Sequence, residues 1–149
     1  MPKFEIESIL PLEAETLATD LLCMSGVNDE LAPFIRMTTP KSWNSKPISE
    51  WPIGKELFSS VILVCGLIPI DMHHFKFQKV GKDGFQESSR SLVNRVWAHE
   101  RTIVACGPDA KVRDTVFFES RLGWLGHLLT PVYRWIFARR HKRLKAKYA

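Results

Sequence analysis

The last third of the chain alternates apolar and polar residues in segments that turn-forming residues separate. Asp83-Gly84 is a strong two-residue hairpin signal, Asn94-Arg95 is a weaker one, and the four residues from Gly107 to Ala110 suit a longer turn. We therefore predict antiparallel strands throughout residues 73–119.

After these strands the apolar spacing changes to a helical period, which predicts one long helix over residues 122–147. At about 1.5 Å per residue, such a helix crosses a whole sheet. Its predicted inner stripe consists of Leu125, Leu128, Leu129, Val132 and Ile136, widened by Tyr133 and Phe137.

The first part of the chain predicts a strand and two short helices. Phe4 and Ile6 alternate with acidic residues and indicate a strand that ends at Pro11, and residues 14–21 have helical spacing before the stop at Ser25-Gly26. A second short helix is expected to begin near Asn28, a good cap. We interpret residues 39–51 as a surface excursion or a lid. The apolar residues 57–70 fit a strand and a buried helix equally well.

The three turns also fix the pairing registers. Counting outward places Phe77 opposite Arg90, Arg90 opposite His99, and Arg101 opposite Val116, with Asp114 diagonal to Arg101. A slip of one residue would move a strand's side chains to the other face, but all three turns agree on which face is apolar. We expect this face to look toward the long helix. It holds Phe75, Phe77, Leu92, Trp97, Ile103, Val112, Val116 and Phe118, together with Lys79, Ser88, Arg90, His99, Arg101 and Asp114.

Several stretches resemble the START-like or polyketide-cyclase (SRPBCC) superfamily, in a bacterial branch of unassigned activity. They are residues 25–31 with Arg36-Met37-Thr38, residues 66–71, residues 97–102 and residues 133–144. The resemblance spans the full chain and implies the helix-grip fold shared with birch pollen allergen. The implied class is α+β, with a curved antiparallel sheet wrapped around a long C-terminal helix and two short helices after the first strand. It implies no shared catalytic motif.

Composition adds a size, a compartment and the location of the charge. The 149 residues fit one domain, 1–149, and 45% apolar content excludes a mostly disordered chain. Cys23, Cys65 and Cys106 stand beside apolar residues, which predicts buried free thiols in a reducing compartment. The chain shows no signal peptide, so we expect a soluble cytoplasmic protein, as a monomer or homodimer.

The net charge of +5 is concentrated at the end of the long helix. Seven cations and no acidic residue follow Tyr133, which leaves 14 − 16 = −2 for the rest of the chain. Cations at a helix C-terminus complement the helix dipole, and this explanation is favoured over nucleic-acid binding. Peripheral association of this basic end with a membrane surface is a less favoured alternative.

Arg90, His99, Arg101 and Asp114 are the candidate polar groups of the inner face, because charged side chains on an apolar face need partners or a ligand. One interpretation is that they orient a polar group of a ligand. The other is a structural Arg101–Asp114 ion pair, with Arg90 and His99 reaching solvent at a cavity mouth. In the first case the excess of cations favours a carboxylate, a phosphate or a polarised carbonyl.

The leading hypothesis is that a cavity between sheet and helix binds or carries a small, mostly apolar or amphipathic molecule. Its apolar walls would be Phe77, Trp97, Val116, Phe118, Leu128, Leu129 and Val132. The alternative is a cyclase-type or hydrolase-type enzyme in the same cavity, with His99 as general base beside Asp114 or Arg101 stabilising an oxyanion. The sequence offers no activated nucleophile, zinc quartet or phosphate loop, so we expect neither a metal nor a cofactor.

Overall fold

Seven antiparallel strands form a single curved sheet in the order β1-β7-β6-β5-β4-β3-β2. The computed structural model describes residues 2–149. The strands are β1 (Lys3–Leu10), β2 (Ile35–Met37), β3 (Glu56–Val64), β4 (Ile68–Gly81), β5 (Gly84–Ser91), β6 (Asn94–Cys106) and β7 (Asp109–Ser120). The helices are α1 (Ala14–Leu21), α2 (Met24–Leu31) and α3 (Gly123–Lys147), with short 3-10 turns η1 (Lys41–Trp43) and η2 (Ile48–Glu50).

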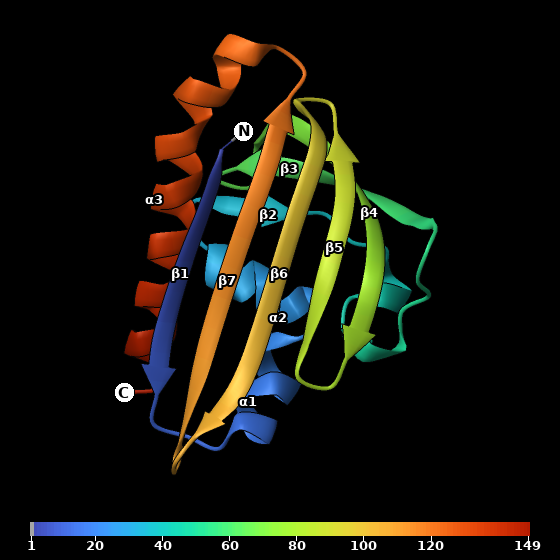
Figure 1. The fold of residues 1–149 in the computed structure, drawn as a ribbon. Coiled ribbons are helices and arrows are strands. Elements are labelled where there is room, and N and C mark those ends of the chain that lie inside the picture. Colours follow the sequence, from blue (N-terminus) through green and yellow to red (C-terminus); the bar gives the residue numbers. More distant parts are fainter. Residues whose placement is uncertain (1) are drawn as a thin grey trace.

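The sheet curls so that β2 and β3 lie behind β6 and β7, with α1 and α2 in its concave side (Figure 1). The long helix α3 runs along the edge of the sheet and packs mainly against β1, β7 and α2. This arrangement confirms the predicted α+β class, with one antiparallel sheet, two short helices after the first strand and a long C-terminal helix. None of the helices in residues 2–149 is both long and apolar enough to cross a bilayer.

Residues 57–70, for which strand and helix were both open, belong to β3, a tight turn and the start of β4. The chain reverses at Cys65 and Gly66, whose φ angles are 53° and 71°. Gly66 adopts this left-handed region without the steric cost of a Cβ. The second short helix begins at Met24, earlier than expected, so Asn28 lies inside α2. Its side chain amide instead bonds the backbone N–H and carbonyl of Met37.

The hairpins pair in registers different from the predicted ones. Glu87 replaces Arg90 as the partner of both Phe77 and His99, which is a shift of three residues in each case. Asp114 replaces Val116 opposite Arg101, a shift of two. The causes are local, because the loops are two residues long at 82–83, 92–93 and 107–108, and the β4–β5 ladder has an irregularity just after Phe77.

These shifts decide which side chains point inward. A shift of two keeps a strand's face, whereas a shift of three reverses it. The two odd shifts on either side of β5 cancel, so β6, β7 and β4 up to Phe77 keep their predicted faces and β5 is reversed. Beyond the irregularity β4 is reversed as well, because Lys79, predicted to face inward, is exposed and Val80 packs against the core. In β5, Phe85, Glu87, Ser89 and Ser91 are therefore buried, whereas Arg90 is exposed on the outer surface. The prediction that Arg90 lines the inner face is wrong.

The helix α3 presents a different face to the sheet than its apolar stripe predicted. Its buried residues are Gly126, Phe137, Arg140, His141 and Leu144. Leu125, Leu129, Tyr133 and Ile136 are half-buried. Leu128 and Val132, which were expected to form a cavity wall, are 60% and 47% exposed.

Residues 39–51 were expected to form a surface excursion or a lid, but part of this segment fills the concave side of the sheet. Ile48 and Trp51 are each only 2% exposed. The Trp51 ring packs against Phe58, Phe75 and Phe77, with centroid distances of 5.6, 6.1 and 5.2 Å. The segment therefore occupies space that a cavity beside Phe77 would need.

The three cysteines are free, but the prediction that they are buried is wrong. Cys65 and Cys106 are exposed and Cys23 is half-buried. Cys65 lies in the β3–β4 turn and Cys106 next to the β6–β7 turn, where the local apolar neighbours on which the prediction rested are themselves exposed.

Candidate functional site

The centre of the inner face is charged and fully buried. Arg101 of β6 faces Asp114 of β7 and donates to it through Nε and Nη2, both at 2.8 Å. The other side of the same guanidinium donates through Nη1 and Nη2 to the Glu30 carboxylate of α2, again at 2.8 Å. The three side chains are at most 2% exposed. One guanidinium thus bridges two carboxylates from different layers of the fold.

Two residues of α3 complete these contacts from the helix side. Arg140 Nε donates to Glu30 Oε1 at 3.1 Å, and His141 Nε2 lies 2.7 Å from Asp114 Oδ2. Ser8 Oγ lies 2.7 Å from the other His141 nitrogen, Nδ1. Because an ionised carboxylate only accepts, His141 donates from Nε2, and as a neutral ring it accepts from Ser8 at Nδ1.

A second branch crosses the sheet from Asp114 toward β4. His99 Nε2 lies 2.7 Å from Asp114 Oδ1, and its Nδ1 lies 3.8 Å from Glu87 Oε1. The Glu87 carboxylate also bonds His73 Nε2 and accepts from Ser89 Oγ at 2.6 Å. We refer to all these ionisable residues together as the buried charge network. Its members are Glu30, His73, Glu87, His99, Arg101, Asp114, Arg140 and His141.

The network holds its carboxylates ionised in spite of burial. Burial alone raises the pKa of Asp114, but Arg101 and the two histidine hydrogen bonds outweigh it and hold that pKa well below the usual value. Burial likewise raises the pKa of Glu30, and Arg101 and Arg140 bring it below its usual value. For Glu87, His73 and His99 overcome the effect of burial and lower the pKa. Burial acts to lower the pKa of Arg101, but the two carboxylates raise it well above its ordinary value.

The charge balance of the network depends on the protonation of its histidines. Arg101 and Arg140 face three carboxylates, Glu30, Glu87 and Asp114, so carboxylates exceed arginines by one when the histidines are neutral. Counting the three histidines as cations, in the way the sequence prediction counted His99, gives five cationic groups to three carboxylates, so the predicted excess of cations remains a prediction. Arg90 does not contribute, since it pairs with Glu56 on the outer surface at 2.6 Å.

The network holds side chains in place and leaves little room for a reaction. His99 has a carboxylate at each nitrogen, its ring packs edge-on against Phe85 and Phe137, and it is 5% exposed. The Arg101–Asp114 contact matches the structural interpretation of that pair, whereas the expectation that His99 reaches solvent is wrong. No group of three His, Cys, Asp or Glu side chains within residues 2–149 is arranged to hold a metal ion.

The network separates two apolar clusters. One lies toward α1 and η2 and includes Phe75, Phe77 and Trp51. The other lies under α3 and contains Phe4, Val116, Phe118 and Phe137, with Trp97, Leu129 and Tyr133 packed against it. In this second cluster Tyr133 stands edge-on to Trp97 and Phe118, with centroid distances of 5.1 and 4.8 Å. Its hydroxyl accepts a 2.8 Å bond from Asn94 Nδ2.

The second cluster reaches solvent at one end of the sheet, which we call the open end. It lies where β6 begins and β7 ends, since Asn94 is paired with Ser120, and His73 of β4 lies beside the end of β5, opposite Ser91. Trp97, Leu129 and Tyr133 are half-buried here although they face inward. His73 adjoins Trp97, with ring centroids 6.3 Å apart, and its cross-strand neighbour is Ser60. Ser60 is fully buried, and its hydroxyl has no hydrogen-bond partner within residues 2–149.

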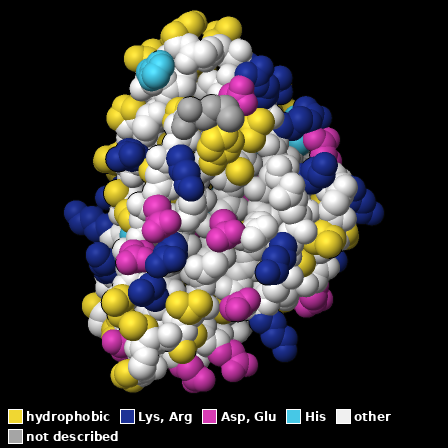
Figure 2. Space-filling model, viewed as in Figure 1, with side chains coloured by type: hydrophobic (Ala, Val, Ile, Leu, Met, Phe, Trp, Pro, Cys, Tyr) yellow, Lys and Arg dark blue, Asp and Glu magenta, His cyan; other side chains and the backbone are white. Residues whose placement is uncertain are grey.

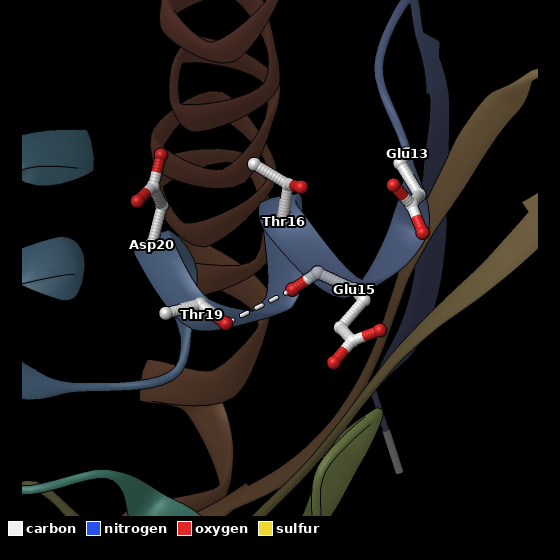
Figure 3. Close-up of a pocket in the computed structure, with 5 residues that line it drawn as sticks. All are labelled: Glu13, Glu15, Thr16, Thr19 and Asp20. Atoms are coloured by element: carbon white, nitrogen blue, oxygen red, sulfur yellow. Dashed lines mark hydrogen bonds between the residues drawn. The ribbon is translucent and has the colours of Figure 1, made fainter.

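The best-formed hollows of the described chain lie away from the network. The larger one, about 330 Å³, is an open depression on α1 (Figure 3). Its walls are Glu13, Glu15, Thr16, Thr19 and Asp20, whose polar side chains suit no apolar molecule. The smaller one holds only about 10 Å³ between α2, β2 and α3. Neither hollow is lined by Arg101 or Asp114, and both of these side chains are buried among their ion-pair partners.

The structure brings together some of the predicted site residues and separates others. Trp97, Val116, Phe118 and Leu129 meet in the second cluster. His99, Arg101 and Asp114 meet in the network, and Phe77 lies in the first cluster. Arg90, Leu128 and Val132 point outward. Sequence reasoning missed Glu30, Glu87, Arg140 and His141, and no pattern along the chain marks Glu30 as buried.

Comparison with solved structures identifies the fold. A START superfamily protein from Mycobacterium smegmatis superposes with a TM-score of 0.66 at 11% identity, covering 98% of this chain and 96% of that one. Ara h 8.0201 superposes with a TM-score of 0.56 at 12% sequence identity, covering 96% of this chain and 97% of that one. DynU16, from the dynemicin biosynthetic locus, superposes with a TM-score of 0.57 at 10% sequence identity. The match covers 98% of this chain and 48% of the DynU16 chain. These likenesses confirm the predicted START-like helix-grip fold.

Sequence comparison is less informative about activity. No curated protein matches the chain. Residues 8–148 match a family model described as "Domain of unknown function (DUF8410)".

Proposed function

The chain belongs to the DUF8410 family, and from its structure we propose that it binds a small, mostly apolar molecule at the open end, between the sheet and α3. The family description names no ligand, so the proposal rests on the side chains at this end. It treats residues 1–149 as one START-like ligand-binding domain, in keeping with a single sheet whose first and last strands pair. A solvent-accessible aromatic surface that faces inward is the kind of lining that apolar ligands use.

Trp97 is the observation that carries the proposal. It packs with Phe118, Tyr133 and Phe137 at centroid distances of 6.2, 5.1 and 6.3 Å, yet it remains half-buried. A tryptophan in such a position offers a large flat surface to a ligand without being fixed in a closed core. Val116 and Phe118 form the floor behind it, and Leu129 packs against the same cluster from α3.

Polar groups at the open end favour a ligand with one neutral hydrogen-bonding group, such as a carbonyl or a hydroxyl. Ser60 offers an unused hydroxyl, and Tyr133 and Asn94 offer a second donor–acceptor pair. The nearest charged group of the network is the His73–Glu87 pair, in which Glu87 also accepts from Ser89 Oγ. No cation of the network is left without a carboxylate partner at this end, so we favour a neutral polar group over an anionic one.

Uptake requires the first half of α3 to move, because the aromatic side chains now touch. Pro131 lies inside α3 and cannot donate the helical hydrogen bond to the carbonyl of His127. Thr130 Oγ1 donates to the Gly126 carbonyl at 2.7 Å, a contact that often accompanies a bend. The turns before Pro131 are thus the part of α3 best suited to swing away from Trp97.

Native mass spectrometry of gently purified protein, followed by titration with a fluorescent apolar probe, tests the proposal. We expect saturable uptake that falls in Trp97→Ala and persists in Trp124→Ala, since Trp124 is 62% exposed on α3. Ser60→Ala should leave the fold intact, because removing an unsatisfied buried hydroxyl is close to neutral. The substitution should lower the affinity for carbonyl-bearing ligands about 2-fold to 10-fold, the range of one hydrogen bond. The affinity for hydrocarbon ligands should be unchanged. Folded protein that takes up no apolar probe would rule the function out.

A further inference from the structure

We propose that the protein docks on an anionic lipid surface through an apolar rim at the end of the molecule where α3 begins. The rim consists of Leu67 in the β3–β4 turn, Ile68 at the start of β4, Leu92 in the β5–β6 loop, Leu122 just before α3, and Trp124 and Leu128 in the first turns of α3. These side chains are 52% to 81% exposed. Single exposed apolar side chains are ordinary, but a group of them at one end marks an interaction surface.

Backbone hydrogen bonds place the rim segments at a common edge of the sheet. The Leu92 N–H donates to the Met72 carbonyl at 3.2 Å, and the Arg121 N–H donates to the Val93 carbonyl at 3.0 Å. Met72 of β4, the β5–β6 loop and the junction of β7 with α3 are therefore neighbours. The β3–β4 turn reaches α3 further along, because the Cys65 N–H donates to the Phe34 carbonyl and Phe34 packs against Trp135. Figure 2 shows hydrophobic side chains at this upper end, over the first turns of α3, while charges of both signs cover the outer face of the sheet.

At the opposite end of the molecule the exposed large hydrophobic side chains of the described residues are fewer. Of the thirteen large hydrophobic side chains that are exposed in residues 2–149, six form the rim and four more adjoin it or α3: Ile70, Phe34, Val132 and Trp135. Ile9, Ile53 and Val104 lie elsewhere. An exposed stripe of α3 continues from Trp124 and Leu128 to Trp135, which is 52% exposed. Spacings of four and seven residues keep these side chains on one face of the helix.

Charge favours an anionic lipid surface as the partner. From Arg121 onward the chain has eight cations and no aspartate or glutamate. Three of the cations pair with carboxylates of α2, whereas Arg134 and Lys142 have no carboxylate partner within the described residues. These two cations are therefore available to anionic headgroups.

The order of residue types along the exposed stripe of α3 agrees with this partner. Trp124, Leu128 and Trp135 are followed, seven residues later, by the exposed Lys142. Exposed tryptophan and leucine side chains can enter the headgroup region of a bilayer, and exposed cations are attracted to anionic lipid. The apolar side chains would enter the headgroup region, and the cations would hold the helix against it.

A second copy of this chain fits the rim less well. In a two-fold dimer the same patch meets itself, so apolar burial would be its main attraction, and the cations along α3 would gain no new carboxylate partner from the equally basic α3 of the second copy. A lipid surface instead supplies the missing negative charge. The rim adjoins the open end, so docking would bring Trp97 close to the lipid, although docking itself does not require the proposed ligand.

Flotation with vesicles tests this docking. We expect the full chain to bind vesicles of phosphatidylcholine mixed with phosphatidylserine, and to bind more weakly to phosphatidylcholine alone or at high salt. Trp124→Ser combined with Leu128→Ser should reduce binding at least about tenfold, because apolar insertion is lost. Ile9→Ser combined with Val104→Ser is the matched control at the other end of the sheet and should bind like the unchanged protein.

Two outcomes would overturn the docking proposal. One is that the folded protein does not bind the mixed vesicles, or that the rim variant and the control variant bind them equally well. The other is a concentration-dependent dimer of the unchanged protein that does not bind vesicles and that becomes monomeric in the rim variant. That result would assign the rim to contacts between copies of the chain. Probe uptake in solution is measured separately, so failure of docking and failure of ligand binding can be told apart.

Discussion

Glu30→Gln is the sharpest test of the buried charge network. The change is nearly isosteric, but it removes the carboxylate that accepts from Arg101 and Arg140. Arg101 keeps Asp114, whereas Arg140 loses its carboxylate partner while it remains only 6% exposed. The mutation therefore leaves a buried guanidinium without a counter-charge.

The expected loss of stability is large. Removing one partner of a buried ion pair costs about 3–5 kcal/mol. For a chain of this size each kcal/mol lost from the free energy of unfolding lowers the melting temperature by about 2–4 °C. The melting temperature of Glu30→Gln should therefore fall by roughly 6–20 °C. Glu56→Gln is the control, because Glu56 is 45% exposed in its pair with Arg90, and it should melt close to the unchanged protein.

The stability that Glu30 contributes should depend on pH in a predictable direction. The folded-state pKa of Glu30 is below its ordinary value of 4.5, so its contribution is fully present above pH 4.5 and is lost as the pH falls through the folded pKa. Urea unfolding of the unchanged protein and of Glu30→Gln should show a large difference in the free energy of unfolding at neutral pH. This difference should become smaller in acid. A difference under about 1 kcal/mol at neutral pH, or one that becomes larger in acid, would refute the reasoning.

Three further outcomes follow from packing and exposure. Gly84→Ala should destabilise the fold by about 1–3 kcal/mol or more, because the new Cβ would clash with the Arg101 carbonyl oxygen, whereas the Cβ of Gly123→Ala meets nothing within 4 Å; thermal melts compare the two. Trp51→Ala should cost about 3–5 kcal/mol in urea unfolding, and equal losses for Trp51→Ala and the exposed Trp124→Ala would contradict the assignment of Trp51 to the core. In the native protein Cys65 and Cys106 should react with Ellman's reagent faster than Cys23, and three equally slow thiols would disagree with their exposures.

The sequence predicted the elements better than it predicted their pairing. Alternation and turn residues located the strands, because side-chain period and turn chemistry are local properties. The register of β5 depended on whether the turn was 83–84 or 82–83 and on an irregularity after Phe77, and no residue type marks either. One reversed strand was enough to exchange Arg90 for Glu87 on the inner face.

The orientation of α3 was missed for an energetic reason. Its apolar stripe suggested that Leu128 and Val132 face inward, but the inner face carries Asp114 and Glu30. A buried carboxylate without a partner costs several kcal/mol, whereas leaving a leucine exposed forfeits about 1.5–3 kcal/mol. The helix therefore turns Arg140 and His141 inward, and this choice becomes visible only when residues distant in sequence are brought together.

The strand order also bears on the route by which the chain reaches its native state. Strands β2 to β7 each pair with their sequence neighbours, whereas β1 pairs with β7, with Lys3 opposite Phe117. A nascent chain still on the ribosome thus holds its first strand without a hydrogen-bonding neighbour until nearly all of the sequence has emerged, and loop closure over such a separation slows folding. We expect pulse-labelled amides of β1 to become protected together with those of α3, after the β3 to β6 hairpins, and earlier protection of β1 would contradict this order.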